Sequence, residues 1–273
     1  VVAHRNRAPV ESLVSMGATE RLSAAEIAAQ CDLVILCVTG SPQVEAALLG
    51  ERGVLEGARE GLIVVDCSTA QPDSTVKLAG LLAAKGIRFC DAPLTRTPKE
   101  AEAGKLGVMI GGDGNLINEI KPVISCFADA IIHAGPVGAG HRLKLINNFL
   151  SLSHAAVAAE AIAVAAKAGV SMQALKDIVV AGGANSVMFE RLIKVPLEND
   201  DSAAKFAIGN ARKDLRYYTS MAEEQASPAL LAEQVLQLYT LAENLGFSDR
   251  YVPRMVDVMM KIGGAGAGGQ SSR

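Results

Sequence analysis

The sequence predicts a fold of the α/β class, with a doubly wound, mainly parallel sheet over residues 1–136 and an all-α domain over residues 137–273. Three observations predict it. Short apolar runs alternate with helical stretches in the first half, helical periodicity alone fills the second half, and the glycine-rich segment GPVGAG at 135–140 separates them. The chain has 273 residues, of which 50% are hydrophobic, so each part has enough apolar material for a core.

The strands of the first half are continuous runs of Val, Ile and Leu, which is typical of strands buried on both faces. The predicted strands are 1–3, 33–38, 62–67, 87–90, 106–110 and 130–133. The predicted helices among them are 9–16, 42–49, 73–85 and 114–123. Strands that alternate with helices indicate right-handed crossovers and a Rossmann-like sheet.

The second half begins with a long Ala-rich helix over 141–168, which is apolar almost all round, as expected of a central helix. Helical periodicity continues at 171–181, 203–224, 228–245 and 250–261. The glycine-rich tail, 263–273, is expected to be flexible.

Charge and cysteine content exclude several classes of protein. The 26 basic and 29 acidic side chains give a net charge of −3, so no basic surface for nucleic acid is expected. The apolar runs are too short to predict a membrane-spanning helix. The five cysteines have no C-x-x-C spacing, which argues against a metal site and favours a reducing, cytoplasmic location. Cys37, Cys67 and Cys90 lie in apolar runs and are expected to pack as small hydrophobic residues.

Three polar residues interrupt the long apolar helix. Lys144, Asn147 and Asn148 are spaced to share one helix face. Buried polar groups need partners or a ligand, and a desolvated lysine can move protons in catalysis. The alternative is a lysine that reaches solvent beside two amides of the helix end.

A second candidate is the segment DAPLTRTP at 91–98, which directly follows a predicted strand. Loops at the carboxyl ends of parallel strands bind ligands in open α/β sheets. Thr95 and Arg96 could hold a carboxylate there. The alternative is an ordinary loop bounded by prolines.

The end of the first strand carries His4, Arg5, Asn6 and Arg7. An acidic residue near this point of a dinucleotide-binding fold contacts the ribose 2′-hydroxyl, whereas arginine accommodates a 2′-phosphate. The lack of an acid therefore favours NADP over NAD. A solvated basic loop is the alternative.

Small and hydroxylated residues follow two further strands, in CVTGS at 37–41 and DCST at 66–69, and they permit a cofactor to approach closely. Lys213 and Asp214 lie in the helical stretch 203–224, and Phe206 lies seven residues before Lys213 on nearly the same face. The alternative for this pair is a surface charge pair beside a core phenylalanine.

Taken in order, these segments resemble the β-hydroxyacid dehydrogenase family, which includes 3-hydroxyisobutyrate dehydrogenase and, more remotely, 6-phosphogluconate dehydrogenase. The resemblance extends from Val1 to about Val258, and three motifs together make it specific. These are DCST followed by Pro72, DAPLT followed by EAGKLGVMIGGD, and GPVGAGHRLKLINN.

The resemblance implies a role for each matching position. Lys144 corresponds to the catalytic lysine and Asn148 to the amide that orients the substrate. Thr95 corresponds to the residue that binds the substrate carboxylate, with Arg96 and Asn147 beside the substrate. The positions implied to contact NADP are Arg5, Asn6, Arg7, Val38, Thr39, Gln43, Thr69, Phe206 and Lys213.

The sequence departs from the family pattern at two places. The glycine-rich turn G-x-G-x-x-G is absent, and about 25–30 residues of a first strand–helix unit are expected before Val1. Arg96 and Thr97 stand where the family has two glycines, so the substrate cannot be assumed. Arg96 is expected to bind a second anionic group or to narrow the pocket.

The function implied is hydride transfer between NADP(H) and a small 3-hydroxy acid or its semialdehyde, with Lys144 as general acid and base. The all-α domain is expected to form a homodimer or homotetramer. Two alternatives stay open: an imine reductase, against which Lys144 argues, and a non-catalytic module that binds NADP. A 6-phosphogluconate dehydrogenase is disfavoured because Asn147 stands where that branch has histidine.

Overall fold

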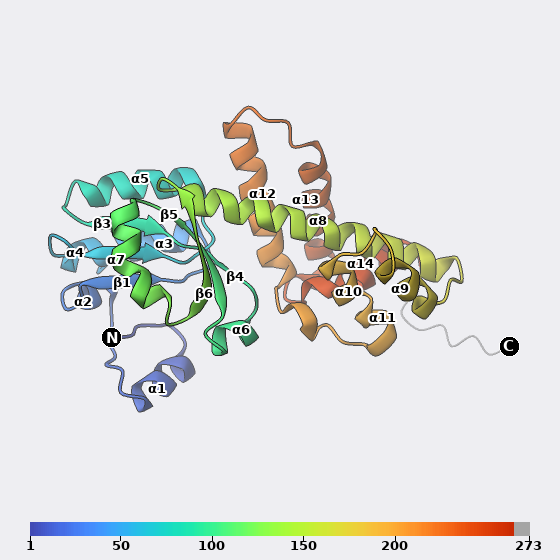
Figure 1. Cartoon of the computed structure of the whole chain (residues 1–273), viewed down its shortest axis with the longest axis horizontal. Helices are drawn as coiled ribbons and strands as arrows, with labels where there is room; N and C mark the ends of the chain where they lie inside the picture. The colour runs from blue at the N-terminus through green and yellow to red at the C-terminus, as the bar shows by residue number, and fades with distance from the viewer. Residues whose placement is uncertain (265–273) are drawn as a thin grey trace. The chain divides into compact units, whose positions relative to one another are not determined.

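The structure is a computed structural model that describes residues 1–264, and the chain divides into two compact units, Val1–Lys144 and Leu145–Arg273 (Figure 1). The first unit holds the sheet. The described part of the second unit is helical, and its one β-type pairing is the isolated bridge between Ala207 and Tyr251. The predicted fold class is therefore confirmed. Most of the tail predicted to be flexible, from residue 265 onward, lies outside the described residues.

The sheet of the first unit is mixed. Its strands are β1 (Leu33–Leu36), β2 (Ile63–Asp66), β3 (Arg88–Asp91), β4 (Leu94–Thr95), β5 (Leu106–Gly111) and β6 (Ala128–Gly135). They lie in the order β1-β2-β3-β5-β4, with β6 beside β5. The pairs β1–β2, β2–β3 and β5–β6 are parallel, whereas β5 runs antiparallel to β3 and β4. The antiparallel pairs arise because the chain continues from β3 into β4 in the same direction and turns back between β4 and β5.

Helices cover both faces of this sheet, which explains the continuous apolar strands. The helices of the unit are α1 (Arg7–Ser15), α2 (Ala24–Ala28), α3 (Ser41–Leu49), α4 (Val54–Gly57), α5 (Pro72–Ala83), α6 (Pro98–Glu102) and α7 (Gly114–Ile124). On one face, Val64 of β2 belongs to a core with Leu48 of α3 and Leu82 of α5. On the other face, its neighbour Val65 belongs to a core with Ile120 of α7. Neighbouring residues in the middle of β2 therefore both need apolar side chains.

Two predictions about the first unit need correction. The predicted strand at 1–3 is no strand, because Val2 forms only a single bridge with Glu20. Cys67 and Cys90 are buried as predicted, but Cys37 is exposed because it lies beyond the end of β1. The short helices α2, α4 and α6 carry too few apolar residues to show a helical period, so the sequence did not predict them.

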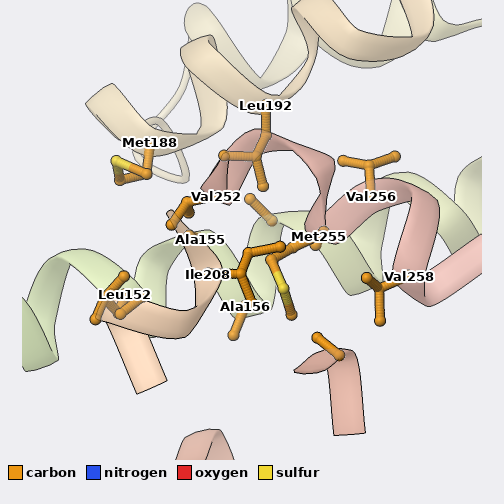
Figure 2. Close-up of a cluster of buried hydrophobic side chains, with 14 of the residues drawn as sticks. Leu152, Ala155, Ala156, Met188, Leu192, Ile208, Val252, Met255, Val256 and Val258 are labelled. Atoms are coloured by element: carbon orange, nitrogen blue, oxygen red, sulfur yellow. The ribbon is translucent and has the colours of Figure 1, made fainter. Parts of the chain in front are cut away.

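The second unit is a helical bundle. Its helices are α8 (Ala139–Lys167), which begins in the first unit, α9 (Met172–Val180), α10 (Val187–Leu192), α11 (Lys194–Glu198), α12 (Ile208–Glu224), α13 (Leu230–Ala242) and α14 (Met255–Ile262). Figure 2 shows its core, where Leu152 and Ala155 of α8 lie among Leu192 of α10, Ile208 of α12 and Met255 of α14. Small side chains on α8 allow the other helices to approach it closely.

The helix α8 has two further properties. The units divide inside it, after Lys144, rather than at the glycine-rich segment before it, because its first turn is bonded to the first unit. Among the described residues, α8 is the one helix long and apolar enough to cross a membrane, a test that the core helices of soluble proteins also pass. Lys144, His154 and Glu160 interrupt its apolar sequence.

Candidate active site

Two loops at the carboxyl ends of β1 and β2 are bonded to each other. The backbone N–H of Val38 donates to Oγ of Ser68 at 3.0 Å, and the N–H of Gln71 donates to Oγ of Ser41 at 2.7 Å. Ser41 and Ser68 are buried, so these bonds are shielded from water. The two loops therefore form one surface at the strand ends, the place where open α/β sheets bind ligands.

This surface presents the residues predicted to contact the cofactor. Val38, Thr39 and Gln43 are exposed and Thr69 is half-buried. The helix α3 begins beside them at Ser41, after an extended Gly40 with no side-chain cap. Hydroxyl groups, exposed backbone and the amino end of a helix suit a dinucleotide with its phosphates. The residues present therefore fit such a cofactor.

The carboxylate of Asp91 holds the beginning of α8. Its Oδ1 accepts a hydrogen bond from the N–H of Gly138 at 2.6 Å, and its Oδ2 accepts one from the N–H of His141 at 2.7 Å. Burial raises the pKa of Asp91, while the nearby His141 and these two bonds act in the opposite direction. Gly140 is required here, because a Cβ would lie 2.4 Å from the carbonyl oxygen of Met109.

The three polar residues predicted to share a face lie on α8, as the helix bounds confirm. Lys144 and Asn147 are half-buried and Asn148 is buried. Nδ2 of Asn147 lies 3.3 Å from Oδ1 of Asn148 and donates to it. One turn of helix therefore carries an amine and two amides.

The sequence did not assign Asp214 to the site, and the structure places it against Asn148. Nδ2 of Asn148 donates to Oδ2 of Asp214 at 2.6 Å, and Nζ of Lys213 lies 3.0 Å from Oδ1 of the same carboxylate. The ammonium of Lys213 also lies 5.2 Å from the ring centre of Tyr217. Side-chain exposures of 17% for Lys213 and 3% for Asp214 show that the alternative of a surface charge pair is wrong.

Phe206 does not share a helix with Lys213. The helix α12 begins at Ile208, and Phe206 precedes it, packed against the core of the bundle. The predicted shared face is therefore wrong. The helical period of the sequence continued through a loop, in which the carbonyl of Phe206 accepts a bond from the N–H of Val252.

The segment 91–98 is partly a strand. Thr95 lies on β4 opposite Gly107 of β5, where a Cβ would come within 2.5 Å of Cγ2 of Thr95. Arg96 follows with φ of 79°, in the left-handed region that favours glycine. Its guanidinium binds Oδ1 of Asp129 at 2.6 Å and the carbonyl of Lys105. An anionic ligand would have to compete with Asp129 for it.

The residues predicted to bind the 2′-phosphate lie together at the beginning of α1. Arg5 and Asn6 are exposed, and Asn6 precedes the helix. Arg7 is bound through both terminal nitrogens to Glu20, which raises the pKa of Arg7 and lowers that of Glu20. Of the two arginines, Arg7 is therefore held by an acidic partner, whereas Arg5 has no acidic partner among the described ion pairs.

Among the described residues, no group of three His, Cys, Asp or Glu side chains could hold a metal ion. In the first unit the structure groups the strand-end residues, and in the second it groups Asn148, Lys213 and Asp214. The helix α8 carries Lys144 at the end of the first unit and Asn148 at the beginning of the second.

Comparison with known proteins gives a consistent family assignment. Residues 1–135 match the family described as the NAD binding domain of 6-phosphogluconate dehydrogenase. Residues 138–259 match that described as the NAD-binding of NADP-dependent 3-hydroxyisobutyrate dehydrogenase.

Individual relatives agree with this assignment. The chain is 29% identical to 2-(hydroxymethyl)glutarate dehydrogenase of Eubacterium barkeri, covering 96% of this chain and 87% of that protein. It is 33% identical to an uncharacterized oxidoreductase of Synechocystis, covering 89% and 83%. The crystal structure of 3-hydroxyisobutyrate dehydrogenase from Salmonella typhimurium matches with a TM-score of 0.82 and 28% identity, covering 94% and 90%.

Proposed function

The chain belongs to the β-hydroxyacid dehydrogenase family, and from this premise we propose that it transfers hydride between NADP(H) and a small 3-hydroxy acid or its semialdehyde. The family supports an NAD(P)-dependent dehydrogenase that acts on a hydroxy acid. The choice of NADP, the substrate and the roles of single residues are the proposal.

The observation that carries the proposal is the arrangement on α8. Lys144 and Asn148 lie one turn apart, and the amide of Asn148 is buried and fixed by Asp214 at 2.6 Å. An amide nitrogen has two hydrogens, so Asn148 can bind Asp214 with one and direct the other at a substrate oxygen. A fixed donor beside an amine suits a reaction in which charge develops on oxygen.

In this proposal Lys144 moves the proton. As an ammonium, its Nζ donates a proton to the carbonyl oxygen of the semialdehyde, and as an amine it removes that proton in the reverse direction. Asn148 orients the same oxygen. When bound, the nicotinamide supplies or accepts the hydride at the carbon that bears this oxygen.

Thr95 and its neighbouring backbone groups hold the substrate carboxylate in this proposal, and Asn147 lies beside the substrate. Two of the relatives described above support a carboxylate, because the name of each describes a hydroxymethyl group on the carbon next to a carboxylate. One of these substrates, a glutarate, has a second carboxylate. Arg96 would be the group that binds such a second anion, after leaving Asp129.

The preference for NADP rests on Arg5. None of the residues 4–6 is acidic. Because Arg7 is bound to Glu20, we assign the 2′-phosphate to Arg5. Val38, Thr39, Gln43 and Thr69 would hold the rest of the cofactor at the strand ends of the first unit.

Homodimer or homotetramer formation through the helical unit is part of the proposal. Exposed apolar residues recur along one side of α8, namely Ile146, Leu150, Val157 and Val164. Single exposed apolar residues are ordinary, but a stripe of them along a helix marks an interaction surface. A second copy of the chain would bury this stripe.

The test is the turnover of Lys144→Ala with NADPH and semialdehydes. General acid catalysis contributes about 10²–10⁴-fold, so we expect a loss of that size in kcat, with binding of NADPH retained. Lys167→Ala, at the last turn of the same helix, is the control and should leave kcat unchanged. Normal turnover by Lys144→Ala would refute the assignment. Binding of NADPH by the wild-type protein without turnover would favour a non-catalytic module, and reduction of imines alone would favour an imine reductase.

A further inference from the structure

His141 is a buried histidine in the first turn of α8, with no exposed surface. Its Nε2 lies 3.1 Å from the carbonyl oxygen of Ser68, and its Nδ1 lies 2.8 Å from Oγ1 of Thr75. A carbonyl oxygen only accepts, so Nε2 carries a hydrogen and donates it to Ser68. The hydroxyl of Thr75 also lies 3.0 Å from the carbonyl oxygen of Gln71, and its one hydrogen can be donated to that oxygen or to Nδ1.

The N–H, the Oγ and the carbonyl of Ser68 each form a hydrogen bond. Its N–H donates to Oδ1 of Asp66 at 2.9 Å, its Oγ accepts from the N–H of Val38 at 3.0 Å, and its carbonyl accepts from His141. Ser68 is only 2% exposed, so none of these bonds has water as a ready substitute. The next residue, Thr69, is one of those assigned to the cofactor. The ring of His141 therefore helps to fix both strand-end loops, together with the bond from Gln71 to Ser41.

The backbone of His141 is fixed independently of its ring. Oδ2 of Asp91 accepts from the N–H of His141, and Oδ1 accepts from Gly138. A substitution at 141 leaves both of these bonds possible, so the beginning of α8 keeps its cap. The ring contact with Ser68 can consequently be removed without removing the anchor of the helix.

The surroundings of the ring are acidic and dry. Oδ2 of Asp66 lies 3.9 Å from Nε2, and Oδ2 of Asp91 lies 3.9 Å from Nδ1. Oδ2 of Asp66 has no hydrogen-bond partner in the part of the chain that the structure describes. A polar ring at this point is therefore a better neighbour for the two carboxylates than an apolar side chain.

We propose that His141 is a positioning residue, whose ring fixes the Ser68–Thr69 segment to the first turn of α8 and thereby sets the affinity for the dinucleotide. The ring is fully buried, so it touches neither substrate nor cofactor and acts through Ser68. This proposal rests on the proposed function for the identity of the ligand. It adds a residue that the motifs of the sequence did not single out.

The test compares two amide variants that differ by one methylene group. In His141→Gln the side chain is long enough to donate to Ser68 and to accept from Thr75, whereas in His141→Asn it is too short to reach Ser68. We expect His141→Asn to raise the Kd for NADPH about tenfold, the cost of leaving a buried carbonyl unpaired, and His141→Gln to stay within about threefold of wild type. The Kd is measured by fluorescence of the reduced nicotinamide without substrate.

Two further measurements separate positioning from a purely structural role. With saturating NADPH, kcat of His141→Asn should return to within about threefold of wild type while KM for NADPH stays raised. The control Thr75→Val removes the partner of Nδ1 but leaves the contact with Ser68, so its Kd should remain that of wild type. Circular dichroism and thermal unfolding establish that each variant is folded.

Several outcomes would overturn the proposal. One is a folded His141→Asn variant with a wild-type Kd, and another is a His141→Gln variant as impaired as His141→Asn. A wild-type protein that does not bind NADPH would overturn it as well. Turnover of semialdehydes by the wild-type protein tests the proposed function separately, because the Kd values are informative whether or not turnover occurs.

Discussion

Asn148 on α8 donates a 2.6 Å hydrogen bond to Asp214 on α12, and both side chains are buried. The carboxylate also faces the ammonium of Lys213 at 3.0 Å. Asp214 therefore joins two residues that the family resemblance assigns separately to substrate and cofactor. A bond from an amide to a buried carboxylate fixes which way the amide points, because the carboxylate accepts and cannot donate.

Asp214→Asn should lower kcat/KM by about 10–100-fold, since bonds to charged acceptors contribute about 1.5–3 kcal/mol. The new amide can donate to Oδ1 of Asn148 and so turn that side chain over. It also leaves Lys213 without its carboxylate. Steady-state kinetics measure the effect. Asp257→Asn is the matched control, because Asp257 belongs to an ion pair with Arg254 elsewhere in the same unit. An equal loss in both variants would contradict a specific role for Asp214.

Arg96→Gly tests the substrate loop. Arg96 has a φ of 79°, and replacing it by glycine relieves backbone strain of roughly 1 kcal/mol. The lost ion pair with Asp129 is partly exposed, at 39% and 47%, and contributes about 0–1 kcal/mol. We therefore expect a free energy of unfolding unchanged or slightly raised. Chemical denaturation measures it, and a loss above about 2 kcal/mol would show that the loop depends on the arginine.

The ion pair between Arg96 and Asp129 also allows a test of substrate selectivity. Asp129→Ala removes the partner of Arg96, so the guanidinium becomes available to an anionic substrate. We expect Asp129→Ala to lower KM for dicarboxylic semialdehydes relative to monocarboxylic ones, and Arg96→Gly to raise it. Identical ratios of kcat/KM in wild type and both variants would exclude Arg96 from substrate recognition.

The sequence predicted most of the sheet, because short runs of Val, Ile and Leu bounded by turn residues are typical of buried strands. The runs LIVVDC and LGVMI lie at β2 and β5 within one or two residues. It missed α10 and α11, which are short and lack a full period of apolar residues. It extended the helix of α12 back over Phe206, since a loop packed on the core also carries apolar residues at regular spacing.

The site was only partly predictable from the sequence. Spacing placed Lys144, Asn147 and Asn148 on one helix face, because helical geometry is local. The burial of Asp214 and the contacts of His141 depend on residues 66 and 73 positions away in the chain, and no local pattern reports them. The ion pair of Arg96 with Asp129 could not be predicted either, because the two residues are 33 positions apart in the chain. A polar residue within an apolar helix is a signal that His141 has on α8, whereas Asp214 lies among other polar residues on α12 and has no such signal.

The cysteines should differ in reactivity by location. Burial raises the pKa of Cys90 to about 12 and that of Cys67 well above its usual range. At pH 8 the thiolate fraction of Cys90 is then on the order of 10⁻⁴, and the thiolate is the reactive form. Alkylation followed by peptide mapping should label the exposed Cys126 first and Cys67 and Cys90 only after unfolding. Rapid labelling of Cys90 in the folded protein would contradict the buried strand position.

The apolar stripe on α8 gives a prediction about assembly. Val157 and Val164 are 69% and 62% exposed and lie two turns apart on one side of the helix. If this stripe is the interface between copies, a charge placed on it must be buried unpaired, at a cost of several kcal/mol. Val157→Asp should therefore give monomers at concentrations where the wild-type protein is a dimer or tetramer, as measured by sedimentation velocity. Val76→Asp, at an exposed valine of α5, should leave the assembly unchanged. A wild-type monomer, or a Val157→Asp variant with the same sedimentation as wild type, would show that this side of α8 faces solvent.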